Sequence, residues 1–420
     1  MNEDKTLGIY IHIPFCASKC GYCDFYSCAG AEKLMGKYQE ALLTHVRESL
    51  PQIQQYYIDS VYFGGGTPSY YGAKYLCEVI ELLKSSGKLL REAEITVEMN
   101  PDSMRLGDLK LLRRAGANRI SMGVQSANNE ILRTIGRRHT YNQAVKAYMF
   151  ARQVGFENVS VDLMYGLPGQ TKEDWADTLS KVIGWNPEHI SCYGLKLEEG
   201  TPMYEVYHDT PVIPDDDMQA DQYIYASELL ERYGYQRYEI SNFAHKGYES
   251  RHNLKYWKLE DYMGFGPGAH SCVGNLRYSY VRDLRRYIAG VLDGGDILDE
   301  QEAVSGIQRA YEYLMLGMRL AEGISQRDYS KQLQSDFAPL QEKLELFRDK
   351  GWVQTVGSRW AFTTSGFLLS NLLIGELLEA QAAQNAIGTP YLQEILNAMD
   401  KEELPMGEEE SFLQQVLGNV

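Results

Sequence analysis

The sequence predicts an α/β protein: a partial (β/α)6 barrel in the N-terminal half, followed by a helical, winged-helix-like C-terminal domain. Six apolar, strand-like segments alternate with helix-like segments between residues 8 and 197. Such repeats favour a parallel sheet, and a closed barrel needs eight of them, so six predict an open, partial barrel. Near Gln301 the pattern changes to three helices, a hairpin and a further helix, an order that resembles a winged helix.

The predicted barrel strands are rich in Ile, Val, Tyr and Met. They span Gly8–Ile13, Ser60–Phe63, Glu94–Met99, Arg119–Gly123, Asn158–Met164 and His189–Leu197. Helical patterns run between them over Glu32–Leu50, Ala73–Leu83, Arg105–Ala115, Tyr141–Val154 and Lys172–Ile183. Because sites on parallel barrels form at the carboxyl ends of the strands, we expect functional residues just after each strand.

The chain divides into four predicted parts. Residues 1–235 form the barrel, which ends in a helix at Asp215–Tyr233. Residues 236–300 form a connecting region that begins with a strand at Gln236–Asn242. Residues 301–382 form the winged-helix-like domain. Residues 383–420 form an acidic helical tail, in which residues 384–420 hold seven acids and one base, a net charge of −6.

Composition narrows the class of protein. The formal net charge of −16 over 420 residues disfavours nucleic acid as the main partner, because phosphate binding needs a basic face. The region from Gly306 to Ser365 has eight basic and seven acidic residues, so we expect it to be a packing module. No stretch reaches the roughly 18 apolar residues that a membrane-spanning helix needs. Seven cysteines, three of them crowded together, indicate a reducing, cytoplasmic location.

Three cysteines near the start carry the strongest functional signal. Cys16, Cys20 and Cys23 have the spacing C-x3-C-x2-C. Three thiolates this close suit one [4Fe–4S] cube, which normally takes four cysteines, so one iron is left to hold a small molecule through an amine and a carboxylate. Zinc is the main alternative, although structural zinc prefers C-x2-C pairs and four protein ligands. Three buried structural thiols are disfavoured by a Gly-rich, Pro-flanked loop that contains Lys19.

The second and third predicted strands end in residues that suit a small ligand. The second strand runs into three glycines and Thr67, and missing side chains there expose the polar groups of the backbone. A tight turn is the alternative explanation for these glycines. The third strand ends in Glu98-Met99-Asn100-Pro101, where the Glu98 carboxylate can pair with an ammonium group.

The fourth and fifth strands are followed by further polar residues. Gln125 can hydrogen-bond ribose hydroxyls, and the guanidinium of Arg137 can fork onto a carboxylate. Asp162 lies at the end of the fifth strand. Each of these residues would be an ordinary surface residue if it stood alone. Together they supply an acid, a base and sugar-binding groups around one rim, which matches an amino acid joined to a nucleoside.

Several of these motifs together resemble those of a known family. The cysteine loop, with Tyr22 before its last cysteine, and the Gly-Gly-Thr-Pro turn are similar to those of radical S-adenosylmethionine (SAM) enzymes. The resemblance covers about residues 7–380. It points to the branch that contains oxygen-independent coproporphyrinogen III dehydrogenase and the HemW-type haem chaperones. It implies a [4Fe–4S] cube on the three cysteines, a one-electron donor, and a SAM site lined by Tyr10, Tyr22, Gly65, Gly66, Thr67, Glu98, Gln125, Arg137 and Asp162.

Two differences between this sequence and the dehydrogenase-type proteins of this branch favour a haem carrier over a decarboxylating enzyme. The dehydrogenase-type proteins carry a further cysteine two residues after the third, where this chain has Phe25, and Cys28 does not restore that motif. They also carry a long N-terminal extension, whereas 15 residues precede Cys16 here. The resemblance therefore implies a chaperone that passes haem to a haem-accepting protein. Oxidative decarboxylation of coproporphyrinogen III is the alternative, an iron–sulfur regulator is a third class, and SAM cleavage stays open.

A histidine motif supports the haem carrier. The run from Arg251 to Trp257 contains His-Asn-x-x-Tyr-Trp, as in the HemW-type proteins. Imidazole is a common axial ligand of haem iron, so His252 is the predicted haem ligand, and nearby aromatic rings can pack on a porphyrin. His270, in a Gly-rich segment, is the second candidate. A structural histidine tied to Asn253 or to the backbone is the alternative.

Overall fold

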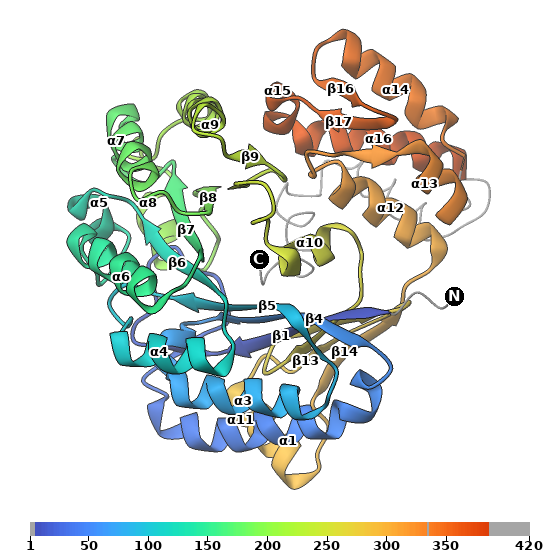
Figure 1. Cartoon of the computed structure of the whole chain (residues 1–420). Helices are drawn as coiled ribbons and strands as arrows, with labels where there is room; N and C mark the ends of the chain where they lie inside the picture. Colours follow the sequence, from blue (N-terminus) through green and yellow to red (C-terminus); the bar gives the residue numbers. More distant parts are fainter. Residues whose placement is uncertain (1–4, 334–335, 386–420) are drawn as a thin grey trace. The chain divides into compact units, whose positions relative to one another are not determined.

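The computed structural model describes residues 5–333 and 336–385 (Figure 1). They form two compact units. The first comprises the chain up to Gln236 with Ser241–His252 and Asp261–Glu302, and the second comprises Arg237–Ile240, Asn253–Glu260 and the chain from Ala303. The predicted connecting region is thus divided between the two units. Most of the predicted acidic tail, residues 386–420, lies outside the described residues.

One sheet of 12 strands, in the order β14-β13-β12-β11-β1-β4-β5-β6-β7-β8-β10-β9, organises the first unit. Its central strands are β1 (Thr6–Ile13), β4 (Tyr57–Gly65), β5 (Leu89–Met99), β6 (Arg119–Gln125), β7 (Asn158–Tyr165) and β8 (His189–Gly194). These six are parallel and lie in chain order. The predicted open arrangement is confirmed, because the sheet formed by the described residues has two free ends and does not close.

Six shorter strands extend this sheet at both ends. Beyond β1 lie β11 (Tyr262–Phe265), β12 (His270–Val273), β13 (Leu276–Tyr280) and β14 (Leu298–Ala303), and beyond β8 lie β10 (Asn242–Ala244) and β9 (Gln236–Arg237). The single strand predicted at Gln236–Asn242 is wrong, because two short strands occupy its two ends. β11 pairs parallel with β1, whereas β12 and β13 turn antiparallel. These strands of a few residues are too short for a clear two-residue period in the sequence.

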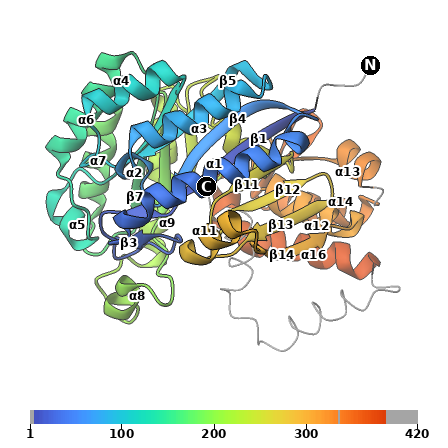
Figure 2. The ribbon, with the colours of Figure 1, turned by 90° about the horizontal axis from the view of Figure 1, so that it is seen from below.

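Helices cover one face of the central strands (Figure 1, Figure 2). The long ones are α1 (Met35–Ile53), α3 (Ala73–Ser85), α4 (Leu106–Ala115), α6 (Tyr141–Val154), α7 (Lys172–Ile183), α9 (Asp216–Arg232) and α11 (Leu284–Asp293). Short ones are η1 (Glu32–Leu34), α2 (Pro68–Tyr71), α5 (Asn129–Thr134) and α8 (Pro202–Tyr207). All five predicted crossover helices are present within a few residues of their expected bounds. None of the described helices is both long and apolar enough to cross a membrane.

The central strands divide their side chains between two faces, as the two-residue period requires. On β1, Ile9, Ile11 and Ile13 join the main apolar core. The opposite face is polar. Its side chains include Tyr10, His12, Ser60, Tyr62, Thr96, Glu98, Ser121 and Asp162. The strand register places Tyr10 beside Tyr62 and Glu98 beside Ser121, so the polar face is continuous from strand to strand.

The second unit contains the predicted C-terminal helices. They are α12 (Gly306–Gly317), α13 (Gln326–Gln332), α14 (Ala338–Asp349), α15 (Thr364–Leu368) and α16 (Ser370–Asn385). The predicted hairpin is β16 (Val353–Val356) with β17 (Arg359–Phe362), and β15 (Ile324–Ser325) completes a small sheet. Trp257, at the end of α10 (Arg251–Trp257), packs against Leu316 and Leu320.

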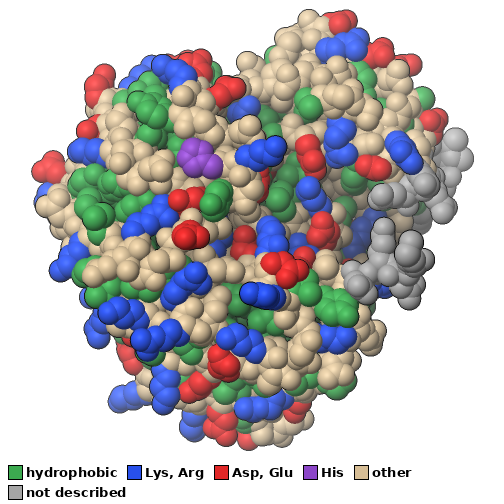
Figure 3. Space-filling view, in the orientation of Figure 1, with side chains coloured by type: hydrophobic (Ala, Val, Ile, Leu, Met, Phe, Trp, Pro, Cys, Tyr) green, Lys and Arg blue, Asp and Glu red, His purple; other side chains and the backbone are tan. Residues whose placement is uncertain are grey.

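Charge is distributed unevenly over the surface despite the acidic excess of the chain. The face in Figure 3 carries acidic and basic side chains side by side, and Lys and Arg gather over its lower part, in the region of α3 and α4. α4 itself contributes Lys110, Arg113 and Arg114. Because these residues lie on the outer helical layer, charge density alone does not locate the polar face of the sheet.

Candidate functional site

The cysteine loop lies at the carboxyl ends of the central strands. Cys16 ends the two-residue strand β2 (Phe15–Cys16), which pairs with β3 (Cys28–Ala29). The backbone N–H of Gly21 donates to the carbonyl of Ile135 (3.3 Å), and the N–H of Met203 donates to the carbonyl of Gly21 (2.9 Å). The loop is therefore tied to the segment that follows α5 and to α8. Cys16 is buried, whereas Cys20 and Cys23 are partly exposed.

The surroundings of Cys16 and Cys23 disfavour the charged thiolate form of both side chains. Burial raises the pKa of Cys16, and it raises the pKa of Cys23 to about 11, with the neighbouring cysteines adding to both shifts. Within the described part of the chain, no three His, Cys, Asp or Glu side chains are grouped closely enough to hold one metal ion. A single zinc needs such convergence, whereas in a cube each thiolate binds a different iron. The preference for the cube over zinc rests on the C-x3-C-x2-C spacing of the three cysteines.

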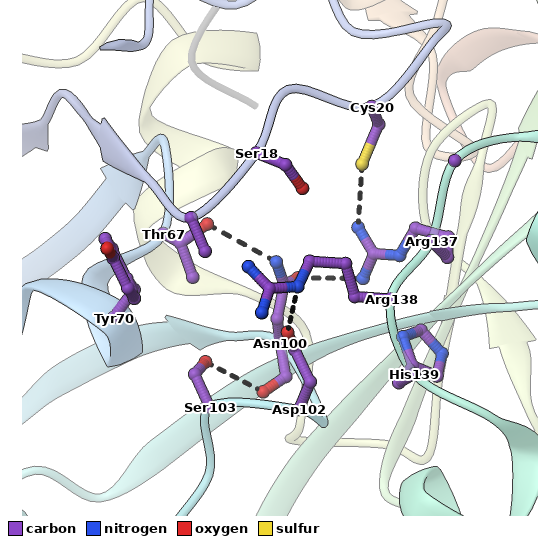
Figure 4. A pocket seen from close by; sticks show the side chains of 12 residues that line it. Ser18, Cys20, Thr67, Tyr70, Asn100, Asp102, Ser103, Arg137, Arg138 and His139 are labelled. Carbon is purple, nitrogen blue, oxygen red and sulfur yellow. Dashed lines mark hydrogen bonds and ion pairs between the residues drawn. The ribbon is translucent and has the colours of Figure 1, made fainter. Parts of the chain in front are cut away.

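Two of the three sulfurs have a polar side chain beside them, and Figure 4 shows the one at Cys20. Thr67 Oγ1 lies 3.3 Å from Cys16 Sγ, and Arg137 Nη1 donates to Cys20 Sγ at 3.7 Å. Asn100 lies between Thr67 and Arg137 and hydrogen-bonds both. These residues line one hollow beside the cysteine loop. Arg137 is thus brought to the cysteine loop, as the sequence predicts for a group that would meet a ligand on the cluster.

The glycines after β4 have a packing reason that the sequence did not reveal. Gly65 has a φ of +103°, and a Cβ there would lie 2.6 Å from the ring of His12. A Cβ at Gly66 would lie 2.8 Å from the carbonyl oxygens of Ile13 and Phe15. The N–H groups of Gly66 and Thr67 donate to those same two carbonyls. The turn therefore locks the start of the cysteine loop, and a ligand role for these two glycines stays a prediction.

Glu98 is a partly exposed carboxyl group with a strongly perturbed pKa. Burial raises that pKa to about 8, although hydrogen bonds from the Tyr62 hydroxyl and the Gly65 N–H oppose the shift. The Tyr62 hydroxyl donates to Glu98 Oε1 at 2.8 Å. A carboxyl group with such a pKa binds an ammonium group only after it releases its proton.

Gln125 ends β6 and Asp162 lies inside the neighbouring strand β7, and the two differ in their hydrogen bonding. Gln125 has a φ of +66°, and its Oε1 is buried without a hydrogen-bond partner. Such an orphaned oxygen is costly unless a donor arrives, so it marks a place for a ligand hydroxyl. The Asp162 carboxylate accepts hydrogen bonds from the hydroxyls of Ser121, Ser160 and Ser191.

The two predicted tyrosines lie on opposite sides of this region. Tyr10 is fully buried, its hydroxyl lies 3.0 Å from Nδ1 of His12, and its ring stacks on Tyr62. Tyr22 packs against an apolar cluster that includes Ile135 and Met203. Tyr10 thus belongs to the polar face of the sheet, whereas Tyr22 helps to seat the cysteine loop.

Comparison with known proteins places the chain in a family. Residues 10–182 match the model of the radical SAM superfamily, and residues 304–369 match the model of the HemN C-terminal domain. Proteins named "Heme chaperone HemW" from Bacillus subtilis and Escherichia coli are each 34% identical over 88% of this chain, and the matches cover 98% and 97% of those proteins. The chain belongs to the HemW family of radical SAM proteins. The predicted resemblance is confirmed.

A solved structure supports the same fold. Coproporphyrinogen III oxidase (HemN) from Escherichia coli, described as a radical SAM enzyme, matches with a TM-score of 0.77 and 24% identity over 89% of this chain and 90% of that one. At this identity the match establishes the fold alone. The predicted radical SAM fold with a C-terminal helical domain is therefore confirmed.

The structure places the HemW-type histidine on the polar face of the sheet. His252 is 1% exposed, its Nδ1 lies 2.9 Å from Ser60 Oγ, and its ring stacks on Tyr62. Its backbone N–H donates to Glu94. His252 is thus linked through Tyr62 to Glu98. His270 on β12 is partly exposed, and burial, with Arg277 and Arg282 nearby, lowers its pKa to about 4.

Two functional candidates escaped the sequence reasoning. Asn100 joins the groups around two cysteine sulfurs, and His12 supports both Tyr10 and the close approach of Gly65. A signal for Asn100 was present, because it directly follows the third strand and precedes a proline. His12 lies inside a strand, and no sequence pattern distinguishes it from an ordinary core histidine.

Proposed function

We propose that this chain binds a [4Fe–4S] cluster and SAM and acts as a haem chaperone that delivers haem to haem proteins. One observation carries the proposal: proteins named as heme chaperones align with 88% of this chain at 34% identity and are covered almost completely. Phe25, 42% exposed, stands where the dehydrogenase-type proteins carry a fourth cysteine. This residue supports a carrier rather than a porphyrinogen decarboxylase.

The residues of the cysteine loop fit the cluster. Cys16, Cys20 and Cys23 would hold three irons, and Thr67 and Arg137 would donate hydrogen bonds to two of the sulfurs. When bound, the cluster supplies a low-potential electron and an open iron for the SAM amine and carboxylate. A one-electron donor must reduce it. The reducing cytoplasm is the compartment that suits such a site and the free cysteines.

The surrounding side chains would bind and orient SAM. Arg137 would neutralise its carboxylate, and Glu98 would accept a hydrogen bond from an N–H of its amine after losing a proton. Gln125, whose Oε1 lacks a partner, would accept from a ribose hydroxyl, and Asp162 retains lone pairs for another. Tyr10 would support the site through its stacking on Tyr62. Tyr22 would support it by helping to seat the cysteine loop. Whether SAM is then cleaved is a separate question.

Haem ligation by His252 requires a change in its surroundings. The His252 ring is buried, and its Nδ1 lies 2.9 Å from Ser60 Oγ, so haem iron could reach the ring only after a local rearrangement. His270 is the more accessible candidate, and its lowered pKa keeps the imidazole neutral, the form that binds metals.

The axial ligand can be assigned by spectroscopy. If His252 binds the iron, His252→Ala shifts the Soret band or reduces the haem stoichiometry, whereas His270→Ala leaves both at wild-type values. Both variants should keep the iron–sulfur signal, since the cysteine loop is a separate site. A His252→Ala spectrum identical to wild type, combined with a shifted His270→Ala spectrum, would reassign the ligand to His270.

Anaerobic reconstitution of the full chain tests the proposed function. About four irons per chain and a saturable Soret band on titration with haem are expected, since one cube carries four irons. A reconstituted chain that holds the cluster but binds no haem would contradict the proposal.

A further inference from the structure

The carboxamide of Asn100 bridges the groups beside two cysteine sulfurs. Asn100 Oδ1 accepts a hydrogen bond from Arg137 Nη2 (2.7 Å), and Nδ2 donates to Thr67 Oγ1 (3.3 Å). A guanidinium has donors only, so the oxygen of the carboxamide must face Arg137 and its NH2 group must face Thr67. Arg137 therefore fixes the orientation of the amide.

This orientation leaves the Thr67 proton available to a neighbour. A threonine hydroxyl has one proton, and its oxygen already accepts the hydrogen bond from Asn100. Once Cys16 binds iron as a thiolate it has no proton to donate, so the Thr67 hydroxyl is the donor across the 3.3 Å contact with Cys16 Sγ. On the other side, Asn100 and the carbonyl of Gly123 hold Arg137 Nη2, which leaves Nη1 on Cys20 Sγ at 3.7 Å. One amide thus orders donors beside two of the three cysteines, and Figure 4 shows the part of this chain of contacts that runs from Thr67 through Asn100 and Arg137 to Cys20.

Asn100 is itself held in place by its neighbours. Its backbone N–H donates to Ser69 Oγ (3.1 Å), and its carbonyl accepts from Ser103 Oγ (3.0 Å). The two serine hydroxyls also contact each other. A side chain whose backbone is anchored on both sides can position two partners without moving with either.

We propose that Asn100 is a positioning residue that directs one hydrogen bond from Thr67 to Cys16 and one from Arg137 to Cys20, and thereby raises the reduction potential of the cluster and braces Arg137 for SAM. Hydrogen bonds to cluster sulfurs and their outer-shell partners tune the potential, because donors stabilise the more negative, reduced form. The inference rests on the proposed [4Fe–4S] and SAM binding.

A double-mutant cycle tests the direction of the Thr67 bond. Thr67→Val is compared in the wild-type chain and in Asn100→Asp, whose carboxylate accepts from both neighbours and so takes the Thr67 proton away from Cys16. In the wild-type background, Thr67→Val should lower the reduced-to-oxidised ratio about tenfold at a fixed potential, a shift of about 59 mV for one electron. In the Asn100→Asp background it should change nothing further. An equal shift in both backgrounds, or none in the wild type, overturns the proposal.

A separate measurement tests the contact between Asn100 and Arg137. Asn100→Leu removes the brace at similar volume, and it should weaken SAM binding about tenfold by isothermal titration, as the loss of one hydrogen bond to a charged group implies. Tyr70→Phe, in the same hollow but outside this chain of contacts, is the matched control and should bind SAM as wild type does. A wild-type SAM affinity in Asn100→Leu would overturn the proposal that Asn100 braces Arg137. A wild-type chain that assembles no cluster overturns the proposed function instead, so the two failures are distinguishable.

Discussion

SAM binding should release a proton from Glu98. Burial holds the pKa of this carboxyl at about 8, so at pH 7 about nine-tenths of the molecules carry the proton. An N–H donor of the bound SAM amine within hydrogen-bond distance favours the ionised form and lowers the pKa. We therefore expect Glu98 to release up to about 0.9 proton per SAM at pH 7 and about 0.1 at pH 9, where it is already ionised.

Isothermal titration in buffers of different ionisation enthalpy measures this release directly. The observed enthalpy should vary with the buffer at pH 7 and become nearly independent of it at pH 9. Glu98→Gln should remove the part of the buffer dependence that Glu98 contributes, so that fewer protons are released per SAM at pH 7 than in the wild type, and it should weaken binding. Tyr62→Phe removes a hydrogen bond that lowers the Glu98 pKa, so it should move the release profile to higher pH. SAM binding at pH 7 without proton release in the wild type would refute the pairing with Glu98.

Three further results are expected. Cys28→Ser should keep about four irons per reconstituted chain, whereas Cys20→Ser should lose the cluster. Arg137→Leu should weaken SAM binding about 10- to 100-fold with the cluster intact, since a hydrogen bond to a charged group contributes roughly 1.5–3 kcal/mol. Gly66→Ala should destabilise the fold by about 1–3 kcal/mol in denaturant unfolding, because the new Cβ would meet backbone oxygens at 2.8 Å.

Each result has a control or a contrary outcome. Loss of iron in Cys28→Ser but not in Cys20→Ser would overturn the ligand set. Unchanged SAM affinity in Arg137→Leu would remove its role at the carboxylate. Gly107→Ala is the matched control for Gly66→Ala, because a Cβ there meets nothing within 4 Å, and equal stability of the two variants would contradict the packing reason.

The sequence predicted best where a pattern repeats or where one spacing has few explanations. The alternation of apolar and polar residues located the six parallel strands, and the C-x3-C-x2-C spacing with Tyr22 located the cysteine loop. Short elements such as β11 were missed because four residues do not establish a period. The close packing behind Gly66 depends on a strand more than 50 residues away in the chain, and no local pattern reports it.

Side-chain geometry at the site could not be predicted from the sequence for the same reason. Asn100 was recognisable as a strand-end residue, but its two partners come from the turn after β4 and from the segment after α5, so its role became visible only in three dimensions. The burial of His252 was equally invisible in the sequence, because its motif is polar and follows a charged segment. Sequence patterns show which residues share one face of a helix or strand. Hydrogen bonds between segments that are far apart in the chain are seen only in the three-dimensional structure.

A competition assay tests the haem chaperone role most directly. The reconstituted, haem-loaded full chain is incubated anaerobically with coproporphyrinogen III, SAM and a one-electron reductant, and both porphyrins are followed by absorption and chromatography. We predict that haem stays bound until an apo-haem protein is added and that coproporphyrinogen III is not consumed. Conversion of coproporphyrinogen III to protoporphyrinogen IX, with no retention of haem, would contradict the proposed role.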